Sequence, residues 1–239
     1  MSAARPDDLD RFIYGNAKLS RAPTPFAASE FGNGGMAPGD IVAKRVSDIV
    51  LGLLFLALAG LPMLLIAAMI RLTSNGPILF RQERIGLNGR RFVMLKFRTM
   101  HDTPVIPGSC PQATRGDPRV TRVGAWLRHT SSDELPQLLN VLGGSMSLVG
   151  PRPHAPGTCV VGRPFEDISH RYAARHRAKP GMTGLAQIRG WRGETDTEEK
   201  LLRRLDSDLE YIATPWSLFG DLRIIARTIA TVLHMPNAY

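Results

Sequence analysis

Residues 49–70 read IVLGLLFLALAGLPMLLIAAMI, a run without a single charged side chain. A straight helix of this length would be about 33 Å long, which is enough to cross the hydrocarbon core of a bilayer. Pro62 lies near the middle, where it removes a backbone hydrogen bond and kinks or breaks a helix. The stretch therefore predicts a membrane-associated segment with a hinge at Pro62.

Three arrangements of this segment are compatible with its sequence: a kinked transmembrane helix, a buried core helix, and a re-entrant hairpin that enters and leaves by the same face. The uniformly apolar composition disfavours the buried core helix. Positive residues flank both ends of the run: Lys44, Arg45, Arg71, Arg81, Arg84, Arg90 and Arg91. Because such residues favour the cytoplasmic side, the favoured assignment places both ends of the apolar run on that side. The forty residues ahead of the segment disfavour a secretory signal peptide.

The composition narrows the class of partner. The formal net charge of +9 favours anionic partners such as lipid headgroups or nucleotide phosphates. Aromatic residues make up 7% of the chain, which is thin for stacking on bases, so we expect no nucleic-acid partner. Cys110 and Cys159 stand far apart, which argues against a disulfide scaffold or a cysteine metal site and fits a reducing cytosol. Residues 1–40 have the composition of a disordered tail.

After the apolar run, turn signals and apolar spacing predict a mostly helical α/β domain with a small sheet. Strands are predicted at 78–80 and 92–97 around a turn at 87–89, and helices at 133–142, 198–212 and 216–233. The last helix is basic and amphipathic. It is equally compatible with lying in a membrane interface and with packing its apolar face on the core.

Asp133 and Glu134 form a pair of adjacent carboxylates at the start of one predicted helix, where Pro136 is tolerated. A cap at Asp133 would place its carboxylate beside free backbone N–H groups and the positive end of the helix dipole, which also attract a substrate phosphate. The simpler alternative is that the two acids only cap the helix and complement its dipole.

Cations and rigid turns surround this pair in the sequence. Arg152 stands between Pro151 and Pro153, which restrict its backbone. Further cations precede the acid pair (Lys96, Arg98 and Arg128) or the predicted turn at Pro180-Gly181 (Arg175, Arg177 and Lys179). A carboxylate that attacks a phosphodiester meets charge repulsion, which such cations and a divalent metal ion offset. This pattern favours chemistry on a phosphate.

From about Ala43 to Tyr239 the chain resembles the bacterial sugar transferases, the monotopic phosphoglycosyl transferases that act on polyprenyl phosphate. Several motifs in the family's order support the resemblance: Lys44-Arg45-Val46-Ser47-Asp48, Gly76-Pro77-Ile78-Leu79-Phe80, Lys96-Phe97-Arg98-Thr99-Met100, Ser132-Asp133-Glu134-Leu135-Pro136-Gln137, Gly150-Pro151-Arg152-Pro153 and Lys179-Pro180-Gly181-Met182-Thr183-Gly184. The chain departs from the family pattern at Ser132, Ser145 and Leu61.

The resemblance implies roles for residues and a division of the chain. Asp133 would be the nucleophile, and Glu134 with Asp133 would hold Mg²⁺ and the diphosphate. The implied phosphate-binding residues are Lys96, Arg98, Arg128 and Arg152, with Thr99, His154, Arg175 and Lys179 as further candidates. The implied division is a disordered tail (1–40), a re-entrant membrane helix hinged at Pro62 (41–72) and a sugar-phosphate transferase domain with interfacial helices (73–239).

The segment Trp191–Thr197 and the C-terminal motifs resemble the hexose branch of the family. That branch implies transfer of hexose-1-phosphate from UDP-glucose or UDP-galactose to undecaprenyl phosphate, with release of UMP through a covalent phosphosugar-aspartyl intermediate, to start exopolysaccharide or capsule repeats. It also implies a monotopic protein on the cytoplasmic face of the bacterial inner membrane, in contact with the membrane lipids. A homo-oligomer is compatible with this arrangement. The alternative is a membrane-tethered basic protein that binds anionic lipid or nucleic acid without catalysis.

Overall fold

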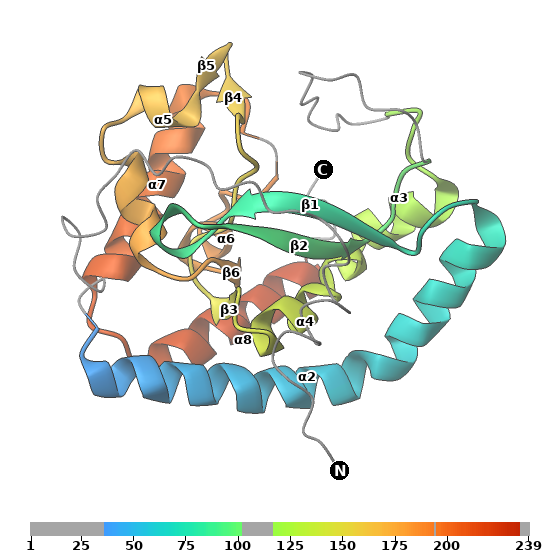
Figure 1. Ribbon diagram of the computed structural model, residues 1–239, viewed down its shortest axis with the longest axis horizontal. Coiled ribbons are helices and arrows are strands. Elements are labelled where there is room, and N and C mark those ends of the chain that lie inside the picture. Colours follow the sequence, from blue (N-terminus) through green and yellow to red (C-terminus); the bar gives the residue numbers. More distant parts are fainter. Residues whose placement is uncertain (1–35, 102–116, 194, 235–239) are drawn as a thin grey trace.

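The computed structural model describes residues 36–101, 117–193 and 195–234, and shows a mostly helical α/β domain with a long apolar helix along one side (Figure 1). The helices are α2 (Pro38–Thr73), α3 (Arg122–His129), α4 (Gln137–Leu142), α5 (Phe165–Ile168), α6 (Leu185–Ile188), α7 (Glu198–Ala213) and α8 (Leu218–His234). The 3-10 turns are η2 (Leu87–Gly89), η3 (Ser132–Glu134) and η4 (Tyr172–Arg177). The strands are β1 (Leu79–Ile85), β2 (Arg91–Phe97), β3 (Ser147–Val149), β4 (Cys159–Val160), β5 (Arg163–Pro164) and β6 (Gly181–Thr183). The mixed, mostly helical fold class is confirmed.

Most of the predicted disordered tail, residues 1–35, lies outside the described residues. The prediction for residues 38–40 is wrong, because they form the first turn of α2. Pro38 is the first residue of this helix, where its fixed φ is already helical and its missing N–H has no intrahelical partner to lose.

The predicted strand pair is confirmed as the antiparallel hairpin β1–β2, with Leu79 opposite Phe97 and Ile85 opposite Arg91. The turn between them holds Asn88 and Gly89 at φ values of 53° and 71°, a left-handed conformation that Asn and Gly adopt at little cost. β1 runs further than predicted because the buried strand β2 offers it a full ladder of partners. The hairpin places Lys96 opposite Phe80, within reach of Glu134.

A parallel pair, β3–β6, joins two motifs that lie far apart in the sequence. Ser147 pairs with Gly181 and Val149 with Thr183, and Gly150 N donates to the Thr183 carbonyl at 2.9 Å. A Cβ atom at Gly181 would lie 2.1 Å from the Gly150 nitrogen, so only glycine allows the two backbones to approach this closely. The Pro151-Arg152-Pro153 segment is therefore fixed against the turn at Pro180-Gly181.

Both ends of α2 pack on this same domain. Near its start, Lys44 pairs with Asp221 of α8 at 2.7 Å, and Asp48 accepts hydrogen bonds from Ser147 Oγ and Leu148 N. Near its end, Ile66 and Ile70 are buried in an apolar cluster that includes Leu127 of α3. The helix is bent, and Pro62 lies within it; its first arm runs below α8 and α4, and its second arm rises beside α3 (Figure 1).

The middle of α2 is apolar and exposed. Leu58, Leu61 and Leu64 are 68–70% exposed, and 11% of the most apolar eighteen-residue window is buried. Within the described residues, α2 is the one helix long and apolar enough to cross a membrane. A buried core helix would have most of these side chains covered, so that alternative is wrong.

The two C-terminal helices are confirmed, within two residues of their predicted limits. α7 begins at the cap Thr197, whose side chain accepts a hydrogen bond from Lys200 N. α8 buries Asp221 and Ile224, but the predicted apolar face stays largely exposed, with Phe219 83% and Ile229 50% exposed. The core of the domain covers only one side of α8.

Gly181→Ala is expected to destabilise the folded domain by about 1–3 kcal/mol, because the added methyl group forces β3 and β6 apart. Gly60→Ala is the matched control, since nothing lies within 4 Å of a Cβ atom at that position of α2. Denaturant unfolding in detergent, followed by tryptophan fluorescence, measures the difference. Equal stabilities of the two variants would contradict the close approach of the two strands.

Candidate active site

Asp133 and Glu134 lie in a tight turn rather than in a regular helix. The predicted helix over 133–142 is divided into η3 and α4, with Pro136 between them at the N-cap of α4. Ser131 precedes η3 in a left-handed conformation, with φ 56° and ψ 16°. The prediction of a helix cap at Asp133 is wrong, because Asp133 lies inside η3 and Pro136 occupies the N-cap position of α4.

Glu134 is the most strongly held group of the site. Lys96 Nζ of β2 lies 2.9 Å from Glu134 Oε1, and the guanidinium of Arg152 donates to both carboxylate oxygens, with 3.1 Å between Nη1 and Oε2. Burial alone would raise the pKa of Glu134, but Arg152 and Lys96 outweigh it and hold the pKa well below its usual range. Glu134 is therefore a fixed anion.

Asp133 is buried but much less strongly held. It forms a long ion pair with Lys96, with 3.7 Å between Nζ and Oδ2, and within the described residues no hydrogen bond to its carboxylate is found. Burial raises the pKa of Asp133, and the negative charge of Glu134 adds to this effect, while Lys96 and Arg152 oppose it. A carboxylate that is basic and not tied by hydrogen bonds suits a nucleophile.

Arg128 and Thr99 form the α3 side of the site. Arg128 Nε donates to Thr99 Oγ1 at 2.9 Å, and the charge of Arg128 acts on the pKa of Asp133. Gly124 makes this contact possible, because a Cβ atom there would lie 2.0 Å from the Thr99 carbonyl oxygen. The structure thus brings Lys96, Arg128 and Arg152 together around the acid pair.

Arg98 is directed elsewhere. Its buried guanidinium donates to the carbonyl of Ser74 at 2.9 Å, to Ser74 Oγ at 2.8 Å and to the carbonyl of Asn75. These groups lie at the C-terminus of α2, where free carbonyls and the helix dipole favour a cation. The geometry gives Arg98 the role of fastening α2 to β2, and does not bring it to the acid pair.

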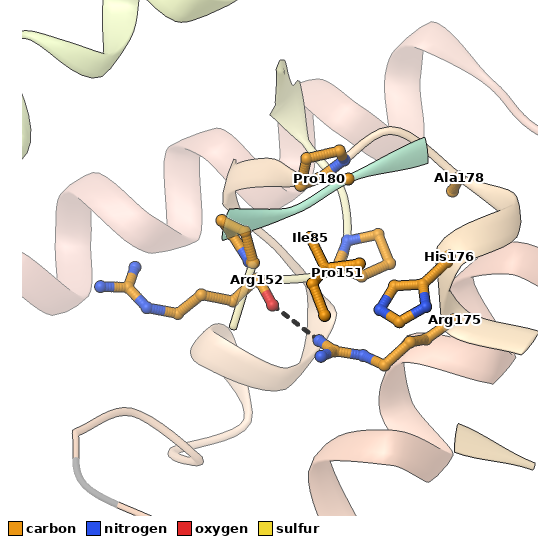
Figure 2. A pocket seen from close by; sticks show the side chains of 9 residues that line it. Ile85, Pro151, Arg152, Arg175, His176, Ala178 and Pro180 are labelled. Atoms are coloured by element: carbon orange, nitrogen blue, oxygen red, sulfur yellow. Dashed lines mark hydrogen bonds between the residues drawn. The ribbon is translucent and has the colours of Figure 1, made fainter. Parts of the chain in front are cut away.

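Arg175 contacts the backbone of Arg152, and His154 contacts Arg175, so both support Arg152 rather than the acid pair directly. Arg175 forms a buried ion pair with Asp208 at 2.6 Å and donates to the backbone carbonyl of Arg152 at 2.7 Å. His154 Nδ1 is 2.6 Å from both Arg175 Nη1 and Tyr172 Oη; burial and the charge of Arg175 lower the pKa of His154, so its ring is neutral. Figure 2 shows the Arg152 side chain directed away from a small hollow lined by Arg175 and His176.

Lys179 lies near the start of α2. The charges that act on its pKa are Arg45, Asp48 and Lys44; together with burial, the two cations lower it. Three further residues were not predicted as site residues: Arg192, which contacts Ser131, Arg204, which contacts Gly193, and Asp208, which contacts Arg175. Their signal in the sequence is weak, because each is one charged residue in a polar loop or helix.

The carboxylates of the acid pair could supply part of the ligands of a Mg²⁺ ion. Mg²⁺ is usually bound through one or two carboxylates together with substrate phosphates and water. Asp133 and Glu134 offer such carboxylates, and the described residues hold no cluster of three or more acidic, histidine or cysteine side chains that would form a complete protein site. A metal ion here would therefore need ligands from the substrate.

The fold and site define a membrane-associated α/β domain with a buried acid pair surrounded by fixed cations. A family model described as "Bacterial sugar transferase" matches residues 39–235, and the chain belongs to this family.

Named relatives match the chain closely. "UDP-glucose:undecaprenyl-phosphate glucose-1-phosphate transferase" of Caulobacter vibrioides is 53% identical over 200 residues, which are 82% of this chain and 72% of the relative. "Undecaprenyl-phosphate glucose phosphotransferase" of Komagataeibacter xylinus is 47% identical over 216 residues, 90% of this chain but 40% of that relative. "Exopolysaccharide production protein PSS" of Rhizobium leguminosarum bv. phaseoli is 45% identical over 194 residues, 81% of this chain and 96% of the relative. The chain thus spans less than half of some relatives and nearly all of others.

Asp133→Asn is expected to stabilise the folded protein at pH 7.5, and Glu134→Gln to destabilise it by about 1–3 kcal/mol. The raised pKa of Asp133 means that folded-state stability is lost as pH rises above the ordinary value of 3.8, and the amide removes that loss. The lowered pKa of Glu134 means the reverse: its stabilisation is present above 4.5 and is lost as pH falls below that value.

Denaturant unfolding of the two variants and the wild type at pH 7.5, in the same detergent, measures both effects. The sign of the change in unfolding free energy decides the outcome. An Asp133→Asn variant less stable than the wild type, or a Glu134→Gln variant as stable as the wild type, would contradict the assignment of one loose and one fixed carboxylate.

Proposed function

We propose that this protein transfers glucose-1-phosphate from UDP-glucose to undecaprenyl phosphate, releases UMP, and so starts an exopolysaccharide or capsule repeat. The observation that supports it most is the buried Asp133 beside a Glu134 that is fixed by Lys96 and Arg152. The family and the names of the relatives from Caulobacter and Komagataeibacter support the substrates. UDP-galactose remains the alternative donor, since it differs from UDP-glucose at one hydroxyl group.

The chemistry divides into two displacements at one phosphorus atom. A carboxylate oxygen of Asp133 attacks the sugar-bearing phosphorus, the bond from that phosphorus to the bridging oxygen breaks, and UMP leaves with the bridging oxygen. An oxygen of the lipid phosphate then attacks the same phosphorus, and the Asp133 carboxylate leaves. Lys96, Arg128 and Arg152 offset the negative charge of the approaching phosphates in both steps.

We propose Mg²⁺ as the cofactor, held by Asp133 or Glu134 together with the donor diphosphate. When bound it would neutralise diphosphate charge as a Lewis acid. The protein's own contribution is a Glu134 that is ionised and fixed before substrate binds.

We propose that α2 is re-entrant and that the domain lies on the cytoplasmic face of the inner membrane. Lys44, at one end of α2, and Ile70, at the other, both contact the same domain, which a helix spanning the bilayer would separate. The exposed apolar middle of α2 and the exposed face of α8 at Phe219 and Ile229 then enter the lipid together. The non-catalytic alternative is disfavoured, because buried paired acids repel a polyanion.

Asp133→Asn is expected to lower transfer by more than about a thousandfold and to abolish the covalent intermediate, because an amide is not a nucleophile at phosphorus. The assay follows UMP release and lipid-linked sugar with UDP-glucose or UDP-galactose, and intact-protein mass spectrometry detects the adduct. Asp206→Asn is the control, since Asp206 lies on α7 with 55% of its side chain exposed. Near-normal turnover of Asp133→Asn would reject the mechanism.

The topology is tested by cysteine labelling in a background without Cys110 and Cys159. Gly39→Cys, at the start of α2, and Val161→Cys, 78% exposed in the domain, are treated with a membrane-impermeant thiol reagent. Neither is expected to react in intact cells, and both are expected to react after permeabilisation, because both lie on the cytoplasmic side. Reaction of Gly39→Cys alone in intact cells would mean that α2 spans the membrane.

A further inference from the structure

Arg204 of α7 is a buried arginine that the chemistry above does not use. It is 8% exposed, donates to the Gly193 carbonyl at 2.7 Å and also bonds Thr195 Oγ1. Burial, with the charges of Arg152 and Arg175 nearby, lowers the pKa of Arg204 to about 10. Burying a cation is costly unless hydrogen bonds satisfy it, and the acceptors here are the Gly193 carbonyl and the Thr195 hydroxyl, just before α7.

The same loop reaches the turn that holds the acid pair. Arg192 Nη2 donates to Ser131 Oγ at 3.1 Å, and the Ser131 carbonyl in turn accepts a hydrogen bond from Glu134 N at 3.3 Å. Ser131 is the left-handed residue two positions before Asp133. The guanidinium of Arg192 is therefore held at the turn that carries the acid pair, on a residue two positions before Asp133 in the sequence.

The donor needs a cation at this turn. A UDP-sugar brings a diphosphate, and its inner phosphate gains charge when UMP leaves. Lys96 and Arg152 are already paired with Glu134, and Arg128 stands on the α3 side of the acid pair, so the Ser131 side is where a further cation would add to the binding of a diphosphate. An arginine suits the remaining task because its planar group donates two parallel hydrogen bonds to phosphate oxygens.

We propose that Arg192 binds the donor diphosphate and that Arg204 is a positioning residue that holds the Arg192 loop in place. This inference rests on the proposed function, because it names the part of the UDP-sugar that Arg192 contacts. Arg204 acts through residues 193 and 195 and touches no substrate.

Arg192→Ala, Arg204→Met and the double variant test the inference by steady-state kinetics and by equilibrium titration with UMP. Arg192→Ala is expected to raise KM for UDP-glucose and to weaken UMP binding, each about tenfold, because a charge-assisted hydrogen bond to phosphate is lost. KM for undecaprenyl phosphate is expected to change less than about twofold. Arg204→Met is expected to shift the same constants, and the double variant to be no weaker than Arg192→Ala, because the two residues act in series.

Arg203→Met is the matched control, since Arg203 is the neighbour of Arg204 on α7 and 60% of its side chain is exposed. Unchanged UMP binding in Arg192→Ala, or effects of Arg192→Ala and Arg204→Met that multiply in the double variant, would overturn the inference. A changed ratio of UDP-glucose to UDP-galactose use with normal UMP binding would assign Arg192 to the sugar and overturn it as well. If Arg204→Met does not fold, Arg204→Lys, which keeps the charge but loses the two-pronged donor, takes its place with the same expectation.

The titration also separates this inference from the proposed function. A wild-type protein that binds UMP but releases none from UDP-hexoses would reject the transferase activity. Loss of UMP binding in Arg192→Ala would still support the phosphate contact.

Discussion

The site depends on the ion pairs of Glu134 with Lys96 and Arg152. These pairs join three segments that are distant in sequence: the strand β2, the turn η3 and the segment between the two prolines at 151 and 153. Because Lys96 and Arg152 pair closely with Glu134, Asp133 is left buried, basic and 3.7 Å from Lys96 Nζ. Two adjacent carboxylates thereby acquire opposite properties, one fixed as an anion and one available to attack.

The membrane helix is tied to the elements that frame this turn. Arg45 of α2 donates to the carbonyls of Val141 and Leu142 at 2.6 and 2.7 Å, at the C-terminus of α4, the helix that follows the acid pair. A cation at that position satisfies free carbonyls and the negative end of the helix dipole. In the proposed arrangement, the depth of α2 in the lipid would therefore set the height of Asp133 above it, and a lipid-borne phosphate would meet the proposed nucleophile at a fixed level.

Short-range sequence patterns predicted the hairpin and the helices, whereas contacts between distant segments decide which of the cations reach the acid pair. The hairpin at Asn88-Gly89 and the periodic helix α7 were predictable because their determinants lie within a few residues of each other. Asp133, Glu134 and Arg152 stood out by their chemistry. The sequence did not distinguish Arg98 from Lys96, since both are cations at the end of the same predicted strand. In the structure Arg98 binds the C-terminus of α2, which is twenty-three or more residues away in the chain.

Helix α7 holds two of the segments that form the site. Arg204 and Asp208 are one helical turn apart and so lie on one face; Arg204 holds the loop of Arg192, while Asp208 holds Arg175 and through it the carbonyl of Arg152. A fully buried ion pair such as Arg175–Asp208 adds little net stability compared with apolar packing, because desolvation offsets most of its attraction. Its value lies in geometry: apolar side chains in its place would fill the same space but would leave the Arg152 backbone without a directed partner.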